Sequence, residues 1–159
     1  MEYAATIYSD GGSRNTGNHK GGSVRPTDKA AWAYLIQTSD GNFEGSAGEF
    51  GATNNKMEIT GLIEAMHRLK ELGMNRDELL FVLDSKYVLD AINQKWLAGW
   101  ARNGFRRSGG ELKNRELWME VHKLLPDFPA AKFVWTKGHA DNQGNLFVDE
   151  LLNRTMDKM

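Results

Sequence analysis

Four acidic residues stand at positions in the chain where they could act together. Asp10 and Asp84 each follow a short run of β-forming residues, while Glu58 and Asp149 lie in two amphipathic runs. Clustered carboxylates repel one another and raise each other's pKa values unless a cation neutralises them. Carboxylate oxygens without a thiolate or histidine cluster select hard cations. The four acids therefore predict a site for Mg²⁺, with Mn²⁺ as the alternative.

Each acid also has a purely structural interpretation, and taken singly that interpretation is the more common one. Asp10 would belong to an Asp-Gly turn and Asp84 would be a helix N-cap. Glu58 would be the capping partner of Asn55, and Asp149 would lie on a solvated helix face. A metal site requires a fold that brings all four acids to one place.

The hydrophobic pattern predicts an α/β fold. We expect strands over residues 3–9, 31–38, 42–50, 79–83 and 132–136, with the polar, glycine-rich segment 11–29 as a loop. Apolar residues at three- and four-residue spacing predict helices over 55–72, from 85 to about 92, over 111–125, and around 147–152. This order implies a mixed five-stranded sheet, with three antiparallel strands followed by two parallel ones, and helices on both faces.

That sheet would gather the acids. Asp10 closes the first expected strand and Asp84 closes the fourth, so both carboxylates should lie at the same edge. Glu58 in the first turn of its helix, and Asp149 on the last helix, would point toward that edge. In open α/β sheets the site lies at the carboxyl ends of the strands, where the connection order reverses.

Composition narrows the class of protein. A length of 159 residues with 40% hydrophobic and 26% charged residues suits a single domain over 1–159. The absence of cysteine excludes disulfides, thiolate zinc sites and cysteine nucleophiles. The sequence shows neither a secretory leader pattern nor an apolar run of transmembrane length, so we expect a cytoplasmic protein without membrane contact. Nothing indicates an obligate protein partner, and we expect a monomer.

A formal net charge of -1 argues against binding nucleic acid by bulk charge, so a polyanion must meet a local basic patch. Residues 95–115 hold six basic side chains against one acidic one, interleaved with Trp96, Trp100 and Phe105. Basic groups bind phosphates, and aromatic rings pack on the sugars and bases of a strand. The alternative is that Trp96 and Trp100 are core residues on one helix face.

At these positions the chain resembles the type 1 ribonucleases H. The resemblance extends over nearly the whole chain and rests on five motifs in the family's order: Asp10-Gly11-Gly12, Asn54-Asn55-Lys56-Met57-Glu58, Asp84-Ser85, Lys137-Gly138-His139-Ala140, and Asn145 with Asp149. It implies a ribonuclease H-like fold and cleavage of the RNA strand of an RNA–DNA hybrid into products with 5′-phosphate and 3′-hydroxyl ends. It also implies two Mg²⁺ ions held by Asp10, Glu58, Asp84 and Asp149.

The resemblance assigns further roles. His139 assists catalysis, since an imidazole with a pKa near 6.5 could move protons or help the product leave; the alternative is an exposed loop histidine. Asn54, Asn55 and Lys86 resemble minor-groove contacts, where 2′-hydroxyls distinguish RNA from DNA. The implied substrate-binding residues are Thr53, Asn54, Asn55, Lys86, Trp96, Trp100, Arg102, Phe105, Arg106 and Asn145.

Two departures from the family bear on the substrate. Lys86 stands where glutamine is common, so the contact becomes a point charge. Gly99 stands where many relatives have asparagine in a DNA-phosphate pocket, which leaves Thr53 without its amide partner. We therefore expect charge to hold the DNA strand, from Arg102 and Arg106 or from two residues of the long polar segment, Arg14 and Lys20.

Two rival functions remain open from the sequence. A non-catalytic module could bind hybrids through the basic segment, although four intact acids disfavour a protein that only binds polyanions. A nuclease or resolvase of the same fold could act on DNA. The Asn54-Asn55 pair and the Lys137-Gly138-His139-Ala140 motif favour the hybrid.

Overall fold

A computed structural model describes residues 3–14, 24–107, 110–136 and 142–159 of the chain. Its elements follow one another in this order: β1 (Ala5–Ser13), β2 (Lys29–Thr38), β3 (Gly41–Phe50), α1 (Asn54–Glu71), β4 (Leu79–Leu83), α2 (Lys86–Asn93), α3 (Trp96–Arg102), β5 (Arg106–Arg107), β6 (Gly110–Glu111), α4 (Arg115–Leu124), a 3-10 turn (Leu125–Asp127), β7 (Ala131–Trp135) and α5 (Gln143–Asp157).

The five longer strands form one sheet in the order β3-β2-β1-β4-β7. β1, β2 and β3 pair antiparallel, whereas β4 pairs parallel with both β1 and β7. The turn between β2 and β3 ends at Gly41, whose φ of 139° suits glycine. The predicted mixed sheet of three antiparallel strands followed by two parallel ones is confirmed.

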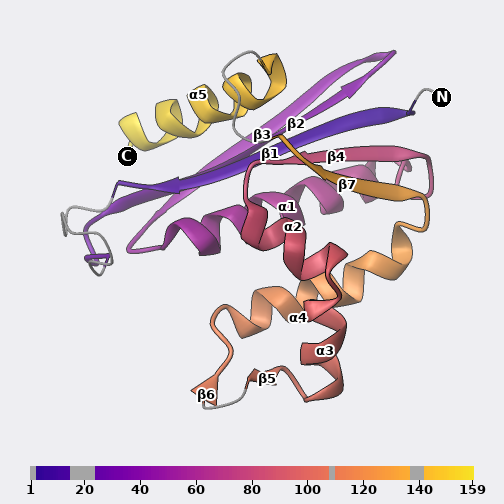
Figure 1. The fold of residues 1–159 in the computed structure, drawn as a ribbon. Coiled ribbons are helices and arrows are strands. Elements are labelled where there is room, and N and C mark those ends of the chain that lie inside the picture. Colours follow the sequence, from indigo (N-terminus) through magenta and orange to yellow (C-terminus); the bar gives the residue numbers. More distant parts are fainter. Residues whose placement is uncertain (1–2, 15–23, 108–109, 137–141) are drawn as a thin grey trace.

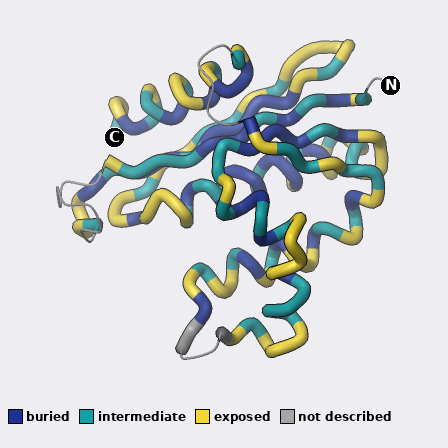
Figure 2. The backbone as a smooth tube through the Cα atoms, in the orientation of Figure 1, coloured by how far each residue is buried: buried dark blue, intermediate teal, exposed yellow. Residues whose placement is uncertain are grey.

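Helices cover both faces of this sheet, as predicted. Figure 1 shows α5 on one face, with α1 and α2 on the other. Alternate residues of β2 serve the two sides: Ala31 and Ala33 pack with Leu152 of α5, while Tyr34 and Ile36 join the larger core that includes α1. Figure 2 shows the buried backbone concentrated where the helices meet the sheet. None of the helices in the described ranges is long and apolar enough to cross a membrane.

β1 is longer than expected, and the interpretation of Asp10-Gly11-Gly12 as a turn is wrong. The strand runs on to Ser13 because β2 continues to pair with it, with Asp10 opposite Ala33 and Ser13 opposite Ala30. The parallel partner β4 stops earlier, at the pair Ser9 and Leu83. Asp10 therefore lies inside β1, at the point where the sheet loses its neighbouring parallel strand.

Gly11 is needed for close packing rather than for a turn. A Cβ atom at this position would collide with the backbone of Met57 and Glu58 in α1. The helix can approach the strand only because residue 11 has no side chain. This contact places Glu58 next to Asp10.

A second region, residues 95–107 and 110–115, lies away from the sheet and is called the basic arm below (Figure 1). It contains α3 and the short β5–β6 hairpin, and it leads into α4, which begins at Arg115 rather than at the expected Glu111. Asn114, just before α4, has a left-handed φ of 58°, which delays the start of the helix. Trp118 of α4 anchors the region, because it is fully buried and its Nε1 donates to the Tyr87 hydroxyl at 3.2 Å.

Candidate active site

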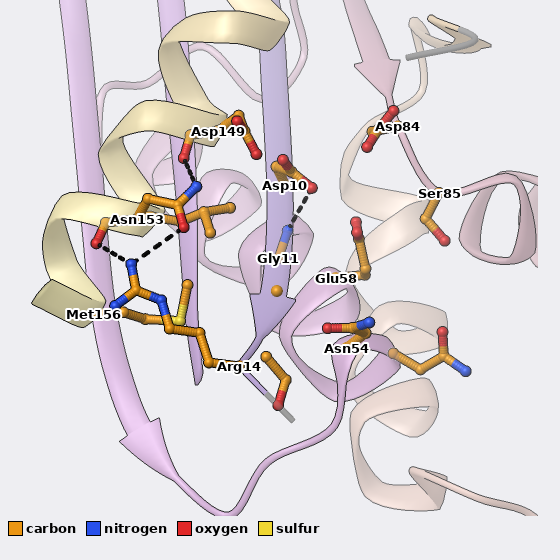
Figure 3. Close-up of a pocket in the computed structure, with 14 residues that line it drawn as sticks. Asp10, Gly11, Arg14, Asn54, Glu58, Asp84, Ser85, Asp149, Asn153 and Met156 are labelled. Atoms are coloured by element: carbon orange, nitrogen blue, oxygen red, sulfur yellow. Dashed lines mark hydrogen bonds between the residues drawn. The ribbon is translucent and has the colours of Figure 1, made fainter. Parts of the chain in front are cut away.

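Three of the predicted acids meet at the edge of the sheet. Asp10, Glu58 and Asp84 each offer a carboxylate oxygen within 4.8 Å of the others. They line a pocket of about 420 Å³, and Asp149 lines the same pocket (Figure 3). Two adjacent strands supply Asp10 and Asp84, whereas α1 and α5 supply Glu58 and Asp149 from opposite faces of the sheet. The predicted convergence of the four acids is thus present in the fold.

Local structure fixes each member of the cluster. The Gly11 amide donates to Asp10 Oδ1 at 2.8 Å. Thr53 caps α1 by accepting from the Lys56 amide, and the helix that starts there places Glu58 just beyond its first turn. Asp84 follows β4 directly, and its carbonyl accepts from Trp135 Nε1 at 3.2 Å.

The structural interpretations of Asp10, Glu58 and Asp84 fail in this fold. Ser85 caps α2 by accepting from the Val88 amide, so Asp84 is not the N-cap. Thr53 performs the same task for α1, so Glu58 is not needed for capping. Asp10 is a strand residue with 5% of its surface exposed, which is unusual for an aspartate without a functional reason.

Burial and mutual repulsion disturb the titration of the cluster. Burial, followed by the charge of Asp84, raises the pKa of Asp10 to about 7, against the lowering effect of its hydrogen bonds from Glu58 and Gly11. Burial also raises the pKa of Glu58 well above its usual value, and the neighbouring Asp10 adds to that rise. Burial and then Asp149 raise the pKa of Asp84. Such a cluster favours a bound cation or a bound proton.

Asp149 lies at the rim of the pocket, outside the tight group of three. It is exposed on α5, and its backbone carbonyl accepts from Asn153 Nδ2 at 2.8 Å. Its charge nevertheless raises the pKa values of both Asp10 and Asp84. Asp149 therefore acts electrostatically on the cluster from the α5 side.

The substrate-binding residues predicted near the acids are exposed, and two of them line this pocket. Asn54 and Asn55 are exposed and line it. Thr53 is exposed as well, with its hydroxyl engaged at the start of α1. Lys86 is exposed, and its ammonium lies 5.1 Å from the centre of the Trp135 ring. All four residues are therefore open to solvent, and Asn54 and Asn55 share the pocket of the acids.

In the basic arm, the predicted residues divide into exposed and packed groups. Trp96, Arg102 and Arg106 are exposed, and Trp96 leaves 43% of its surface open. Trp100 packs against Trp118 with ring centres 5.4 Å apart. This packing matches the alternative in which Trp100 is a core residue. Phe105 contacts His122, with ring centres 5.6 Å apart, so its ring is partly covered.

A second pocket of about 390 Å³ connects the two regions. Its walls are formed by Asn55, Tyr87, Trp100, Leu112, Lys113 and Asn114. Asn55 lines both pockets, so the acid cluster and the basic arm border one continuous surface. Trp100 contributes to this surface as well as to the core.

Three further predicted residues are Asn145, His139 and Lys20. Asn145 is buried in the first turn of α5, where its backbone N–H donates to Asn142 Oδ1 at 2.9 Å. It is absent from the described residues that line the pocket. His139 lies outside the described residues, as does Lys20 of the long polar segment.

Sequence reasoning missed the roles of Asn153 and Trp135. Asn153 lines the acid pocket, four residues after Asp149. Trp135 holds the backbone of Asp84 from the next strand. The spacing of Asn153 on the helix face of Asp149 was a usable signal. The Trp135 contact depends on the register of β4 and β7, which the sequence does not reveal.

Comparisons with known proteins agree with this architecture. The ribonuclease H family model matches residues 2–157. A ribonuclease H of Clostridium botulinum is 35% identical over 153 residues, which cover 96% of this chain and 95% of that protein. A ribonuclease H of Nitratidesulfovibrio vulgaris is 39% identical over 122 residues, covering 76% of this chain and 74% of that protein.

Solved structures share the fold at lower identity. LC9-RNase H1, described as a type 1 RNase H with the type 2 active-site motif, superposes with a TM-score of 0.82 at 22% identity, covering 99% of this chain and 74% of that chain. A foamy viral protease-reverse transcriptase solved in complex with RNA/DNA hybrid gives a TM-score of 0.77 at 20% identity, covering 99% of this chain and 20% of that chain. From the family match and the curated relatives, the chain belongs to the ribonuclease H family and is a ribonuclease H hydrolase.

Proposed function

We propose that this chain is a metal-dependent endonuclease that cleaves the RNA strand of RNA–DNA hybrids and leaves 5′-phosphate and 3′-hydroxyl ends. The observation that carries the proposal is the group of three carboxylates within 4.8 Å of one another, in a pocket that Asn54 and Asn55 also line. We propose Asp10, Glu58, Asp84 and Asp149 as the ligands of two Mg²⁺ ions, with Mn²⁺ as a possible substitute.

The donor set fits such ions. The cluster offers carboxylate oxygens only, which suits a hard divalent cation. Burial and then mutual repulsion raise the pKa values of Asp10, Glu58 and Asp84, which supports a cation at this site. When bound, the ions would supply Lewis acidity to an attacking water and to the departing 3′ oxygen.

The chain's own residues have distinct tasks in this reaction. Asp10 and Glu58 must be ionised to act as metal ligands, and their raised pKa values favour activity at neutral or higher pH. We propose that His139 transfers a proton or assists product release, so that His139→Ala lowers kcat about 10²–10⁴-fold without abolishing cleavage.

Substrate choice is assigned to the surface around the pocket. Asn54, Asn55 and Lys86 would contact the minor groove, where the 2′-hydroxyls of the RNA strand are displayed. Thr53 and the basic arm, through Trp96, Trp100, Arg102, Phe105 and Arg106, would hold the DNA strand. Asn145, in the first turn of α5, is proposed as a further substrate-binding residue. All the named residues come from one chain, so we propose that the monomer is active.

The test uses duplexes with both strands labelled: RNA–DNA hybrid, duplex DNA and duplex RNA, each incubated with Mg²⁺ or with chelator. We expect only the RNA strand of the hybrid to shorten, and only with the metal. Extension of the products by a polymerase checks the 3′-hydroxyl, and ligation checks the 5′-phosphate. Asp10→Asn protein is the matched control for contaminating nucleases. Cleavage of the DNA strand, or cleavage in chelator, would contradict the proposal.

A further inference from the structure

Arg14 is the one basic residue among the described residues that line the acid pocket. It directly follows β1, four positions after Asp10, and its amide donates to the Lys29 carbonyl at 2.8 Å. A substrate phosphate that enters this pocket meets four acids, so the position of a cation within it decides which phosphate can be held nearby.

The side chain of Arg14 is directed to the α5 side of the pocket. One terminal nitrogen lies 2.7 Å from Asp157 Oδ1, and the other donates to the carbonyl and to Oδ1 of Asn153 at 3.2 and 3.4 Å. Asn153 in turn donates to the carbonyl of Asp149. Figure 3 shows Arg14 reaching toward α5, with Asn54 on the side of α1.

These contacts orient the guanidinium without neutralising it. The side chains of Arg14 and Asp157 are 40% and 63% exposed, and an ion pair this open to solvent contributes little to stability. One terminal nitrogen faces Asp157 and the other makes both bonds to Asn153, so the second hydrogen of the first nitrogen and the Nε hydrogen have no partner among the described residues. An arginine held in this way can still present a fork of donors to a phosphate.

We infer that Arg14 binds a phosphate of the RNA strand next to the scissile one, on the α5 side of the acids. This inference rests on the proposed function. It assigns Arg14 to the RNA strand, whereas the sequence led us to expect that Arg14 holds the DNA strand. Arg14 lines the acid pocket, whereas the second pocket borders the basic arm and is shared through Asn55. A strand held on the arm would lie beyond Asn55, while the strand that enters the acid pocket is the one to be cut.

The test measures hybrid binding in Mg²⁺ by fluorescence anisotropy, over a series of KCl concentrations, in protein carrying Asp10→Asn so that the substrate persists. We expect Arg14→Gln to raise the Kd about tenfold at low salt and to reduce the slope of log Kd against log salt by about 0.7–0.9. Arg154→Gln is the matched control, because Arg154 is an exposed arginine of α5 outside the set of pocket-lining residues.

Asp157→Asn separates phosphate binding from a structural tie to α5. It breaks the ion pair but leaves the charge of Arg14, so we expect unchanged or tighter hybrid binding. Equal losses of affinity for Arg14→Gln and Asp157→Asn, with equal falls in Tm, would overturn the inference. So would wild-type affinity for Arg14→Gln.

Neutral backbone substitutions identify the strand. A single methylphosphonate in the RNA strand beside the scissile phosphate should weaken binding of the Asp10→Asn protein, and should have no further effect once Arg14→Gln is added. If only a methylphosphonate in the DNA strand shows this coupling, Arg14 serves the other strand and the inference is wrong. Failure of the proposed function would look different, because wild-type protein would then leave the RNA strand of the hybrid intact.

Discussion

The acid pocket and the basic arm are built in opposite ways. The pocket lies where buried strands end against a tightly packed helix, and Gly11 leaves no space for even a methyl group. The basic arm consists of short elements joined at left-handed residues, with φ of 63° at Lys95, 60° at Phe105 and 58° at Asn114. Within it, the space beside Gly99 is open, since a Cβ atom at this position would lie 3.9 Å from its nearest neighbour, the Arg102 guanidinium.

This difference matches what each region must do. Carboxylates that share ions need positions fixed to a fraction of an ångström, which packing against a rigid sheet provides. Phosphate binding by point charges tolerates movement, because Coulomb attraction varies slowly with distance. We therefore expect changes in the pocket to affect kcat and stability, and changes in the arm to affect KM and its salt dependence.

The largest expected effect is loss of cleavage in Asp10→Asn or Asp84→Asn. Each removes a charged ligand at constant volume, and we expect kcat to fall at least about 10³-fold, or about 4 kcal/mol in activation free energy. Hybrid binding and the circular dichroism spectrum should remain. Arg106→Gln in the arm is the comparison, with an expected rise in KM and little change in kcat. Cleavage at wild-type rates by folded Asp10→Asn protein would contradict the assignment of the acid cluster as the active site.

Next in size is a pH-dependent effect of Mg²⁺ on stability. The pKa of Asp10 is about 7 in the folded protein against an ordinary value of 3.8, so its protonated form stabilises the metal-free fold at low pH. That stability is complete below about pH 4 and is lost as the pH rises through about 7, with an upper limit of about 4 kcal/mol. Mg²⁺ requires the ionised form, so its stabilisation should grow as the pH rises.

Thermal unfolding at pH 5.5 and pH 8, with and without millimolar Mg²⁺, measures this linkage. We expect the Tm increase from Mg²⁺ to be larger at pH 8, and we expect Asp10→Asn to abolish most of the difference. An increase that is equal at both pH values would mean that Mg²⁺ binds elsewhere on the protein.

The two glycines give a third contrast. Gly11→Ala places a Cβ against the backbone of Met57 and Glu58, which cannot move aside as a side chain could. We expect a loss of about 3 kcal/mol, which corresponds to about 6–12 °C in Tm. Gly99→Ala in α3 should instead stabilise the protein by up to about 1 kcal/mol, since alanine favours helix and the space is open. Differential scanning calorimetry of both variants measures these changes in Tm. A Gly11→Ala variant as stable as the wild type would contradict the close approach of α1 to β1.

The sheet and the convergence of the acids were predictable because both depend on strong patterns. Buried apolar runs of strand length fixed the strand order, and acids after the runs 3–9 and 79–83 follow from parallel pairing of those strands. The end of β1 was not predictable in the same way. Gly11 and Gly12 read locally as a turn, yet long-range pairing with β2 extends the strand to Ser13.

Side-chain roles in the basic arm were the least predictable. The sequence left Trp96 and Trp100 equivalent, and only tertiary contacts separate the exposed Trp96 from Trp100, which packs on Trp118. The start of α4 depends on the left-handed Asn114, which periodicity alone does not signal. Arg14 was assigned by charge to the DNA strand, because its proximity to the acids depends on the contacts of β1 with α5.

The smallest expected effect concerns Gly99→Asn and tests whether charge alone holds the DNA strand in the arm. The resemblance places an amide at residue 99 beside Thr53, and here that amide is missing. If Arg102 and Arg106 compensate by charge, KM for the hybrid should rise steeply with KCl, by about 0.9 log units per log unit of salt for each phosphate contact on duplex DNA. A neutral amide hydrogen bond adds about 0.5–1.5 kcal/mol with little dependence on salt. Gly99→Asn should therefore lower KM at high KCl by a factor of about 2–10.

Gly99→Ala is the matched control for this measurement. Both substitutions fill the open space in α3 and remove the flexibility of glycine, but only asparagine supplies an amide. If both variants lower KM equally, the gain comes from a more rigid helix rather than from a phosphate contact. If neither variant changes KM at low or high KCl, another residue already fills the phosphate position, and the correspondence between Gly99 and the family's asparagine has no functional meaning. A reduction confined to Gly99→Asn at high KCl would show that the arm tolerates an added specific contact, in contrast to the acid pocket, where Gly11 leaves no space for one.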